Sequence, residues 1–460
     1  MNTNCHNSKL IDIAQFSAAI VIGLGITGFS VVRYLRARGL KVSVLDSRKE
    51  PTLASQLLSG YPDIELILGS FDNVNLAIDS LIVVSPGIPL SEPFLLKAKK
   101  LGATIVGDIE LFIQENTKPI IAITGSNGKS TVTTLVGRMC ESGGKKTLVA
   151  GNIGLPVLDA LTNKYDYEVA VLELSSFQLE TTSQISAQSV AILNISADHL
   201  DRYSSMGDYV LAKTRILKGA ENVVLPKHDA LLDQITHKEG VLKFTLSEPA
   251  NDSEYGVKRV SNNRWLLKGE RRLIKLRDIP LLGLHNVSNV LAAYALVDFL
   301  NLSEESKSTA VKSFTGLAHR MQTVSINKNV TWINDSKATN IGATSTALLS
   351  LEKDVFWIAG GQGKGADFTE LRSSIKRNIK LLVLMGEDAD QIESALNGLL
   401  EIECVENMHD AVCLVGERAT SGAVVLFSPA CASFDMYQNF ERRGDDFSDN
   451  VRAWVKRGAA

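Results

Sequence analysis

The stretch that most constrains the fold of this chain runs from Pro119 to Cys140 and reads PIIAITGSNGKSTVTTLVGRMC. It begins with an apolar run typical of a buried strand, passes through a glycine-rich turn and ends in residues with helical apolar spacing. A strand, a glycine loop and a helix in this order form a phosphate cradle, because backbone N–H groups at the helix start bind phosphate oxygens. The stretch therefore predicts a nucleoside triphosphate site in a parallel α/β domain.

The side chains of this loop supply the rest of such a site. Lys129 would neutralise the outer phosphates, and Ser130 or Thr131 would offer a hydroxyl to Mg²⁺. The loop is shorter than the usual GxxxxGK[ST] pattern, because Ile123 stands where the first glycine would be. An ordinary strand-turn-helix junction is the alternative, but the strand before the loop and the periodic helix after it favour the phosphate site.

Length and composition narrow the class of protein. A chain of 460 residues has the length of about three domains. Its net charge of -3 gives no sign of the positive charge that binding to nucleic acid or an anionic membrane requires. The five cysteines form no CxxC pair, which argues against a disulfide framework and a zinc site. With no signal-peptide pattern and no membrane-length apolar run, we expect a cytoplasmic protein.

The first domain, expected over residues 1–107, carries a second glycine loop. A predicted strand, Ala18 to Ile22, leads into GLGITG at Gly23 to Gly28, and Asp46 follows a second strand. This spacing matches the dinucleotide fingerprint and by itself would indicate an NAD-type oxidoreductase. The loop, however, accommodates any diphosphate with a ribose, and glycines that serve packing alone remain the alternative.

In the central domain, expected over 108–316, two predicted strands end in metal-binding residue types. Glu173 follows one strand and His199 another, and the carboxyl ends of parallel strands share one sheet edge. Both could therefore bind Mg²⁺ near the phosphate loop. The alternatives are that Glu173 caps the next helix, that His199 is a satisfied polar residue, and that Lys213 is a solvated lysine.

The remaining sequence predicts hairpins and a third sheet. Residues 220–282 alternate apolar and polar, and we interpret the basic segment Lys268 to Arg277 as a solvated strand face. From 317 to 460, strands again alternate with helices and end in polar clusters, which predicts a third parallel sheet covered on both sides. Two such domains facing one phosphate site would close over the substrates.

Taken together, the motifs of this chain resemble the Mur ligase family. The resemblance extends from about Val21 to Asp446 and rests on GLGITG, SPGI, GDIELF, TGSNGKSTVTTLVG, GNIG, LELSSFQLE, DHLDRY, HNVSN, GLAHR, NDSKATN, GGQGKGADF and SPACASFDMYQNF. It implies an α/β protein with a Rossmann-like UDP-binding domain, a central P-loop ATPase-like domain and a Rossmann-like C-terminal domain. It also implies an ATP-dependent ligase that adds D-glutamate to UDP-N-acetylmuramoyl-L-alanine through an acyl phosphate, in peptidoglycan precursor synthesis.

The resemblance also assigns site residues. The UDP-sugar would contact Ile26, Thr27, Ser47, Arg48, Gly87 and Asn152. ATP would contact Gly125, Asn127, Gly128, Lys129, Ser130, Thr131, Asn289, Arg320 and Asp335. D-glutamate would contact Lys337, Thr339, Lys364, Ser433, Phe434 and Phe440. Two Mg²⁺ sites would use Ser130, Glu173, His199 and a carbamate on Lys213, and the catalytic residues would be Lys129, Glu173, His199 and Lys213.

Other functions stay open at this point. A sister ligase would add a different amino acid, and a folylpolyglutamate-type synthetase would share the ATP half but lack the GLGITG domain. A nicotinamide-dependent dehydrogenase would leave the ATP loop idle, and a P-loop regulatory protein would bind nucleotide without turnover. We expect a monomer whose partners are small molecules, with neither nucleic acid nor membrane among them.

Overall fold

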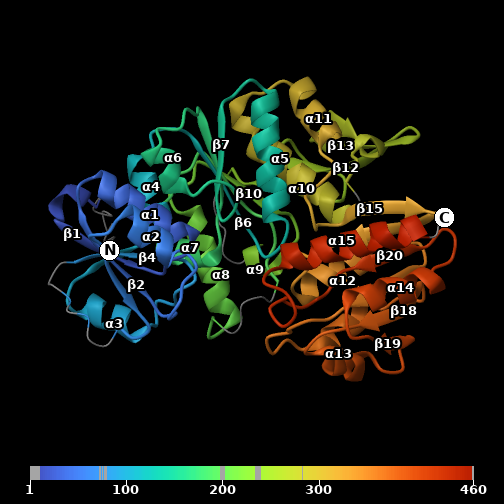
Figure 1. The fold of residues 1–460 in the computed structure, drawn as a ribbon. Coiled ribbons are helices and arrows are strands. Elements are labelled where there is room, and N and C mark those ends of the chain that lie inside the picture. Colours follow the sequence, from blue (N-terminus) through green and yellow to red (C-terminus); the bar gives the residue numbers. More distant parts are fainter. Residues whose placement is uncertain are drawn as a thin grey trace. The chain divides into compact units, whose positions relative to one another are not determined.

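The computed structural model describes residues 11–71, 74, 76, 80–196, 202–233, 240–281 and 283–457. Its contacts divide the chain into two compact units, which are described separately. The first consists of Met1–Ile195, Arg202–Lys275 and Asn289–Val311, and the second of Ser196–Asp201, Leu276–Ser288 and Lys312–Ala460. The predicted α/β class is confirmed, because three largely parallel sheets alternate with helices along the chain (Figure 1).

The first sheet is entirely parallel, with the strand order β3-β2-β1-β4-β5. Its elements are η1 (Ile13–Gln15), β1 (Ala18–Ile22), α1 (Ile26–Ala37), β2 (Lys41–Asp46), α2 (Ala54–Gly60), β3 (Glu65–Leu68), β4 (Leu81–Val84), α3 (Pro93–Lys100), β5 (Thr104–Val106) and α4 (Asp108–Glu115). In register, Ile22 pairs with both Leu45 and Val84, so β1, β2 and β4 end at one edge.

The loop after β1 requires its glycines. A Cβ on Gly28 would lie 1.8 Å from the carbonyl oxygen of Gly23, and Gly23 itself has a φ of +92°. No other residue allows the start of α1 to approach β1 this closely.

The second sheet has nine strands in the order β14-β13-β12-β11-β10-β9-β6-β8-β7. Strands β6 to β12 pair in parallel, whereas β12, β13 and β14 form antiparallel hairpins. Its elements are β6 (Ile120–Thr124), α5 (Lys129–Ser142), β7 (Thr147–Gly151), α6 (Val157–Thr162), β8 (Val169–Glu173), α7 (Ser176–Glu180), β9 (Ser189–Ile192), α8 (Met206–Thr214), η2 (Arg215–Leu217), β10 (Asn222–Pro226), α9 (Ala230–Asp233), β11 (Leu242–Phe244), β12 (Glu254–Val260), β13 (Asn263–Lys268), β14 (Arg271–Lys275), η3 (Leu276–Asp278), α10 (Leu284–Leu296), η4 (Asp298–Leu300) and α11 (Glu304–Ser313).

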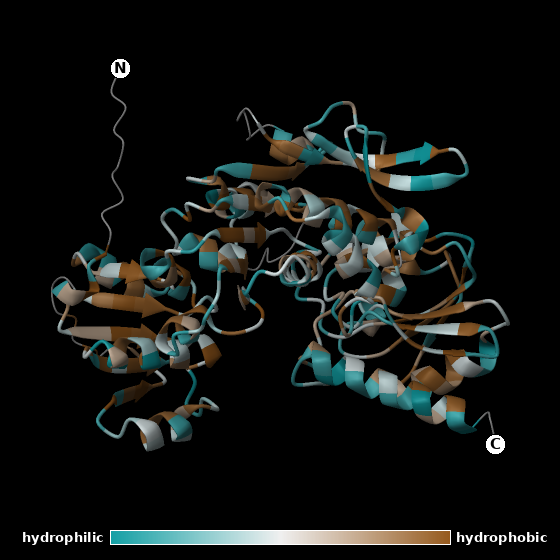
Figure 2. Ribbon diagram, turned by 90° about the horizontal axis from the view of Figure 1, so that it is seen from above, coloured by the Kyte–Doolittle hydropathy of each residue, from teal (hydrophilic) through white to brown (hydrophobic). Residues whose placement is uncertain are grey.

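The third sheet lies in the second unit and has the order β15-β16-β20-β17-β18-β19, parallel except for the β15–β16 pair. Its elements are β15 (Gln322–Asn327), β16 (Val330–Asn334), α12 (Ile341–Leu349), β17 (Val355–Ala359), η5 (Phe368–Ser374), β18 (Ile379–Leu384), α13 (Ala389–Leu396), β19 (Ile402–Cys404), α14 (Met408–Arg418), β20 (Val424–Phe427) and α15 (Phe440–Arg457). Hydrophobic residues line the strands, whereas the long α15 is mostly hydrophilic (Figure 2).

Burial explains why the strands were predictable. Every residue of β4, β6, β8, β17 and β20 is buried, so each strand contains a run of at least four apolar residues, which only Thr124 in β6 and Glu173 in β8 follow with a polar side chain. Among the described residues, no helix is both long enough and apolar enough to cross a membrane.

Candidate active site

The phosphate loop of the first unit joins β6 to α5. Gly128 caps the helix in a left-handed conformation, with a φ of +83°. A Cβ at this position would lie 2.6 Å from the side-chain oxygen of Asn289, which α10 brings to the loop. Asn127 completes the turn, since its N–H donates to the side-chain oxygen of Asn194 at 2.8 Å. The fold thus places Asn289, a residue from far along the chain, against the glycine loop.

Two lysines converge on one carbonyl oxygen of this loop. Nζ of Lys129 donates to the carbonyl oxygens of Gly125 and Ser126 at 2.8 and 3.0 Å. Nζ of Lys213, on α8, also donates to the Gly125 carbonyl, at 2.9 Å. The alternative of a solvated lysine is wrong, because Lys213 is only 2% exposed. With Lys213 unmodified, two ammonium groups thus lie close together at the glycine loop.

Glu173 ends β8 beside β6, where it pairs in register with Ile123. It is 1% exposed, and its Oε1 accepts a hydrogen bond from Nδ2 of Asn152 at 2.8 Å. Its Oε2 is buried with no hydrogen-bond partner among the described residues. The alternative that Glu173 caps α7 is wrong, because Ser175 caps that helix in a capping box with Gln178. A buried carboxylate oxygen without a partner fits a site for a hard cation.

The other predicted metal ligands are placed only in part. Ser130 lies in the first turn of α5 and is buried, as is Thr131. His199 lies outside the described residues. Within the described ranges, no group of three or more His, Cys, Asp or Glu side chains could hold a metal ion. A two-metal site therefore stays a prediction.

The predicted UDP contacts of the first domain gather at one sheet edge. Ile26 and Thr27 begin α1 after β1, Ser47 and Arg48 follow β2, and Gly87 follows β4. Ile26 is 72% exposed, although most large apolar side chains of this domain are buried. The edge thus presents an apolar side chain and a cation beside the glycine loop.

The carboxylate of Asp46 forms hydrogen bonds within the protein. Its carboxylate accepts a hydrogen bond from the N–H of Leu24 at 2.7 Å and from the guanidinium of Arg48 at 2.7 Å. Burial acts to raise the pKa of Asp46, but the hydrogen bonds from Arg48 and Leu24 outweigh it and lower that pKa to about 2. The acid that would bind a ribose in the NAD fingerprint therefore supports the loop and holds Arg48.

In the second unit, Asp335 follows β16 and is buried. Oγ of Ser428 donates to its Oδ2 at 2.9 Å, and the N–H of Met321 donates to its Oδ1 at 3.1 Å. Burial raises the pKa of Asp335 to about 7, against the hydrogen bonds from Ser428 and Met321 and the charge of Arg320. The carboxyl can therefore change protonation near neutral pH.

The predicted D-glutamate residues form two pairs of a cation and an aromatic ring. Nζ of Lys337 lies 3.8 Å from the ring centre of Phe440, and Nζ of Lys364 lies 5.1 Å from that of Phe434. Phe434 is 63% exposed, whereas the neighbouring Ser433 is buried. Cations over aromatic rings are held in place while they remain able to contact an anion. The half-buried Thr339 completes the set, and its N–H donates to the Lys337 carbonyl at 2.8 Å.

One residue of this region was missed by the sequence analysis. Arg443, on α15, is 1% exposed and donates to the carbonyl oxygens of Ser336, Cys431 and Ala432 at 2.9, 3.0 and 3.0 Å. Desolvation lowers its pKa to about 10, so the guanidinium stays charged at neutral pH. It ties together the segments that carry Lys337 and Ser433. A signal was present, because residue 443 shares its helix face with the apolar Phe447 and Val451.

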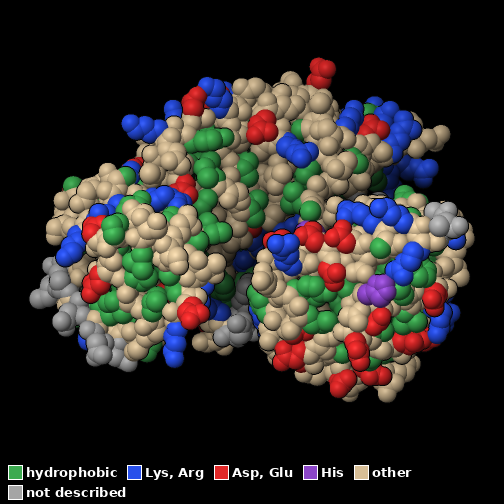
Figure 3. Space-filling model, in the orientation of Figure 1, with side chains coloured by type: hydrophobic (Ala, Val, Ile, Leu, Met, Phe, Trp, Pro, Cys, Tyr) green, Lys and Arg blue, Asp and Glu red, His purple; other side chains and the backbone are tan. Residues whose placement is uncertain are grey.

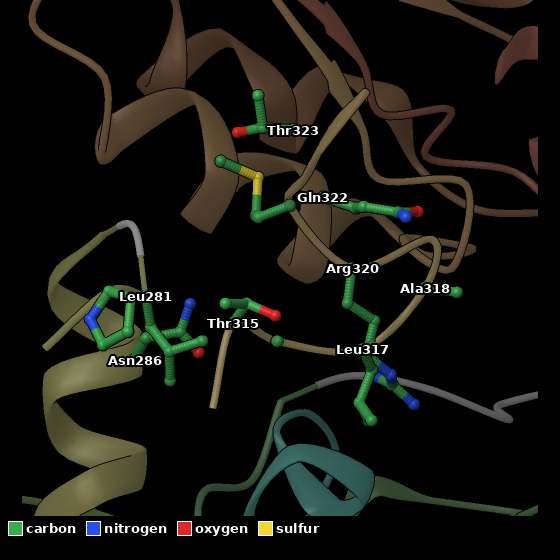
Figure 4. Close-up of a pocket in the computed structure, with 11 residues that line it drawn as sticks. Leu281, Asn286, Thr315, Leu317, Ala318, Arg320, Gln322 and Thr323 are labelled. Carbon is green, nitrogen blue, oxygen red and sulfur yellow. The ribbon is translucent and has the colours of Figure 1, made fainter. Parts of the chain in front are cut away.

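A cavity of about 310 Å³ lies beside Arg320 in the second unit (Figure 4). Its walls include Pro280, Leu281, Asn286, Leu317, Arg320 and Thr323. Figure 4 shows Leu281 and Asn286 on one side and Leu317 and Arg320 on the other. The cavity is large enough for part of a small ligand and offers both apolar and hydrogen-bonding groups.

The basic segment around β13 and β14 is a solvated face, as expected. Figure 3 shows Lys and Arg side chains gathered over this hairpin. Arg271 and Arg272 are exposed, whereas Leu273 and Ile274 are buried. Arg271 forms ion pairs with Asp298 and Glu304, which lowers the charge available to a partner.

Three family models match the chain in succession. The Mur ligase MurD-like N-terminal domain matches residues 17–107, the Mur ligase middle domain matches 123–297, and the Mur ligase glutamate ligase domain matches 319–431. Each model covers one of the three sheets.

Curated proteins similar to the chain span nearly its whole length. UDP-N-acetylmuramoylalanine--D-glutamate ligase of Hahella chejuensis is 44% identical over 438 residues, covering 94% of this chain and 97% of that protein. The enzyme of the same name from Pseudomonas aeruginosa is 43% identical and covers 95% of this chain and 98% of that protein.

Solved structures share the fold at lower identity. MurF ligase from Thermotoga maritima, in complex with ADP, has a TM-score of 0.60 at 13% identity and covers 97% of each chain. UDP-N-acetylmuramate-alanine ligase MurC, also from Thermotoga maritima, has a TM-score of 0.59 at 20% identity and covers 96% of this chain and 99% of that one.

Proposed function

This chain belongs to the Mur ligase family, and on that premise we propose that it is an ATP-dependent ligase that joins D-glutamate to UDP-N-acetylmuramoyl-L-alanine. The observation that carries the proposal is the set of relatives named for this reaction, which are 43–44% identical over 94–95% of the chain. The reaction makes an amide in a precursor of peptidoglycan. A sister ligase with another amino-acid substrate is the alternative that the experiment below tests.

We assign one substrate to each domain. Residues 1–107 would bind the UDP-sugar, 108–316 ATP, and 317–460 D-glutamate together with part of ATP. The exposed Ile26 and the Asp46-held Arg48 support the first assignment, because a nucleotide offers both a flat base and phosphates. Asn152, which hydrogen-bonds Glu173, would reach the same substrate from the central domain.

The first chemical step is proposed at the phosphate loop. The terminal carboxylate of the UDP-sugar substrate attacks the γ-phosphate of ATP, so that an acyl phosphate forms and ADP leaves. Lys129 and Lys213 both lie on the Gly125 carbonyl, where Lys129 would turn to the phosphates and offset the charge that develops on them. Gly125, Asn127, Gly128 and Thr131 would supply backbone and hydroxyl donors, with Asn289, Arg320 and Asp335 contacting the same nucleotide.

The amine of D-glutamate then attacks the acyl phosphate, and the tetrahedral intermediate collapses to the amide and phosphate. D-glutamate carries two carboxylates, and Lys337 and Lys364 would bind them. Ser433, Phe434, Phe440 and Thr339 would complete this pocket. A free carboxylate is a poor acyl donor, so its phosphorylation provides the leaving group that amide formation needs.

Mg²⁺ is proposed as the metal, held by Glu173, Ser130 and His199. The buried Oε2 of Glu173, which has no hydrogen-bond partner among the described residues, supports this assignment, because a buried carboxylate oxygen without a donor fits a cation ligand. When bound, Mg²⁺ would neutralise phosphate charge. We propose that Lys213 carries a carbamate formed with CO₂. Its burial beside the Lys129 ammonium supports this, since carbamylation replaces a costly buried cation with a metal-binding anion.

We further propose that the protein works as a cytoplasmic monomer on these small molecules, without nucleic acid or a membrane. The net charge of -3 supports the absence of a nucleic-acid partner.

A phosphate-release assay tests the proposal. The protein is given ATP, Mg²⁺, UDP-N-acetylmuramoyl-L-alanine and, in turn, D-glutamate, L-glutamate, D-alanine, L-lysine and glycine. We expect phosphate release to depend on both the UDP-sugar and D-glutamate. If another amino acid supports more release than D-glutamate does, the chain is a sister ligase. If release needs no UDP-sugar, the assignment of the first domain fails.

A further inference from the structure

A cluster of a thiol, an imidazole and an amide lies on the second unit, outside the residues of the proposed reaction. Sγ of Cys413 lies 3.7 Å from Nε2 of His409, four residues earlier on α14. Nδ1 of the same ring lies 3.0 Å from Oδ1 of Asn450 on α15. Cys413 is partly exposed and forms no disulfide. Cysteine, histidine and asparagine in this order are the groups that activate a sulfur nucleophile.

The hydrogen bonds around Asn450 determine which nitrogen of His409 carries the proton. Nδ2 of Asn450 donates to the carbonyl oxygen and to Oδ1 of Asp446 at 2.9 and 3.0 Å. The amide nitrogen therefore points to Asp446, and its oxygen must face the imidazole. That oxygen can only accept, so Nδ1 of His409 carries the hydrogen. The lone pair of Nε2 is then directed at Cys413, positioned to take the proton of the thiol.

We propose that Cys413 is a thiol-modification site that reacts with small disulfides. As Sγ attacks one sulfur of the disulfide, its proton passes to Nε2 of His409 and a new sulfur–sulfur bond forms. The old sulfur–sulfur bond breaks with its electron pair on the leaving sulfur, which then takes the proton. The disulfide is the oxidant, and one of its halves leaves as a free thiol. Asn450 acts as a positioning residue that holds the ring.

The chain contains its own control thiol. Cys404, at the end of β19, is more exposed than Cys413, but its Sγ lies 3.8 Å from Oε2 of Glu393. Burial raises the pKa of Cys404, and the charges of Glu393 and Asp390 raise it further. If exposure alone set reactivity, Cys404 would react first. If the neighbouring base sets it, Cys413 reacts first.

The cluster also connects to the segment that carries Ser433 and Phe434. The hydroxyl of Tyr437 donates to Oδ2 of Asp446 at 2.7 Å, and the N–H of Tyr437 donates to the carbonyl of Ser433 at 2.8 Å. Burial raises the pKa of Tyr437, so its hydroxyl keeps the proton that it donates. A group attached to Cys413 would displace His409 and, through Asn450 and Asp446, loosen this segment. The consequence for D-glutamate binding rests on the proposed function.

The reaction is tested with the neutral disulfide 2,2′-dithiodipyridine at pH 7, under pseudo-first-order conditions. Peptide-resolved mass spectrometry follows each thiol and separates Cys413 from Cys5, which lies outside the described residues. We expect Cys413 to react about tenfold faster than Cys404, and His409→Phe to remove that advantage while the rate at Cys404 is unchanged. Asn450→Leu should slow Cys413 less than His409→Phe does, and Asn450→Asp, which keeps an oxygen to accept from Nδ1, should restore the rate. A rate at Cys413 no higher than at Cys404, or unaffected by His409→Phe, overturns the proposal.

The connection to the substrate segment is tested by hydrogen exchange, which needs no turnover. We expect modification of Cys413 to quicken exchange of the amides from Ser433 to Tyr437, and Cys413→Ser to be unaffected by the reagent. Tyr437→Phe should show the quick exchange before any modification. Unchanged exchange in the modified protein refutes the connection. In a turnover assay the modified enzyme should show a raised KM for D-glutamate and an unchanged KM for ATP. If the unmodified enzyme shows no D-glutamate-dependent turnover at all, that result counts against the proposed function and not against the thiol reaction.

Discussion

Arg443 provides the sharpest test of how the second unit holds its substrate residues. Replacement by methionine keeps the apolar stem of the side chain and removes the guanidinium. In the structure that group donates to the carbonyls of Ser336, Cys431 and Ala432 and to the hydroxyl of Ser336. The carbonyl of Ala432 keeps a second donor, the N–H of Gln362 at 3.0 Å. The substitution therefore deprives two buried carbonyls of the donor seen here.

The size of the effect follows from these two groups. A buried acceptor that loses its donor costs about 1–3 kcal/mol, which gives about 2–6 kcal/mol for both carbonyls. Methionine also removes the cost of burying a charge, which offsets part of this loss. We therefore expect Arg443→Met to lower the free energy of unfolding of the second unit by about 3 kcal/mol.

The assay is urea unfolding followed by tryptophan fluorescence. Trp332 and Trp357 are buried in the third sheet, and Trp265 in the first unit is replaced by phenylalanine so that the signal reports the second unit. The matched control is Arg442→Met, since Arg442 is the exposed neighbour on the same helix and its loss should change stability by less than about 0.5 kcal/mol. Equal effects of the two substitutions would refute the role assigned to the Arg443 hydrogen bonds.

Three further outcomes are expected. Lys129→Ala should lower turnover by at least about a hundredfold in the phosphate-release assay, and a near-normal rate would mean that the triphosphate binds elsewhere. Glu173→Gln keeps an acceptor for Asn152 but replaces the carboxylate by a neutral amide. It should therefore raise the Mg²⁺ concentration needed for half-maximal turnover, and an unchanged Mg²⁺ dependence would contradict metal binding by Glu173. Asp335 has a pKa of about 7 in the folded protein, so between pH 4 and 7 it keeps a proton that the unfolded chain loses. The free energy of unfolding of the second unit should therefore fall as pH rises through this window. Asp335→Asn should flatten that slope, and an unaltered slope by the same fluorescence assay would show that the carboxyl is not the cause.

The strands were accessible to sequence analysis because their signals are local. The strand predicted over Ala18 to Ile22 matches β1, since it is an apolar run that ends in a glycine turn. The helix after the glycine loop was also expected from its apolar spacing, and it spans Lys129–Ser142. The alternative in which Glu173 caps α7 could also have been rejected from local sequence, because the serine and glutamine of the capping box, Ser175 and Gln178, are both present there.

Local sequence could not predict the burial and hydrogen bonding of side chains that contact segments far away along the chain. Lys213 has the sequence context of a solvated helix lysine, yet its ammonium is buried on the Gly125 carbonyl, 88 residues away along the chain. Arg443 looks like one of several charges on a polar helix, and its burial depends on carbonyls from two other loops. The sequence pattern suggested that Asp46 binds a ribose, but in the fold Leu24 and Arg48 donate hydrogen bonds to its carboxylate.

The amino-acid order of this chain was thus sufficient to predict the α/β class, the glycine loop between β6 and α5 and the succession of three sheets, because apolar periodicity and glycine geometry act between near neighbours. The burial of Lys213 and Glu173 and the raised pKa of Asp335 depended on tertiary structure, because desolvation and hydrogen bonding come from whichever segments fold around a side chain.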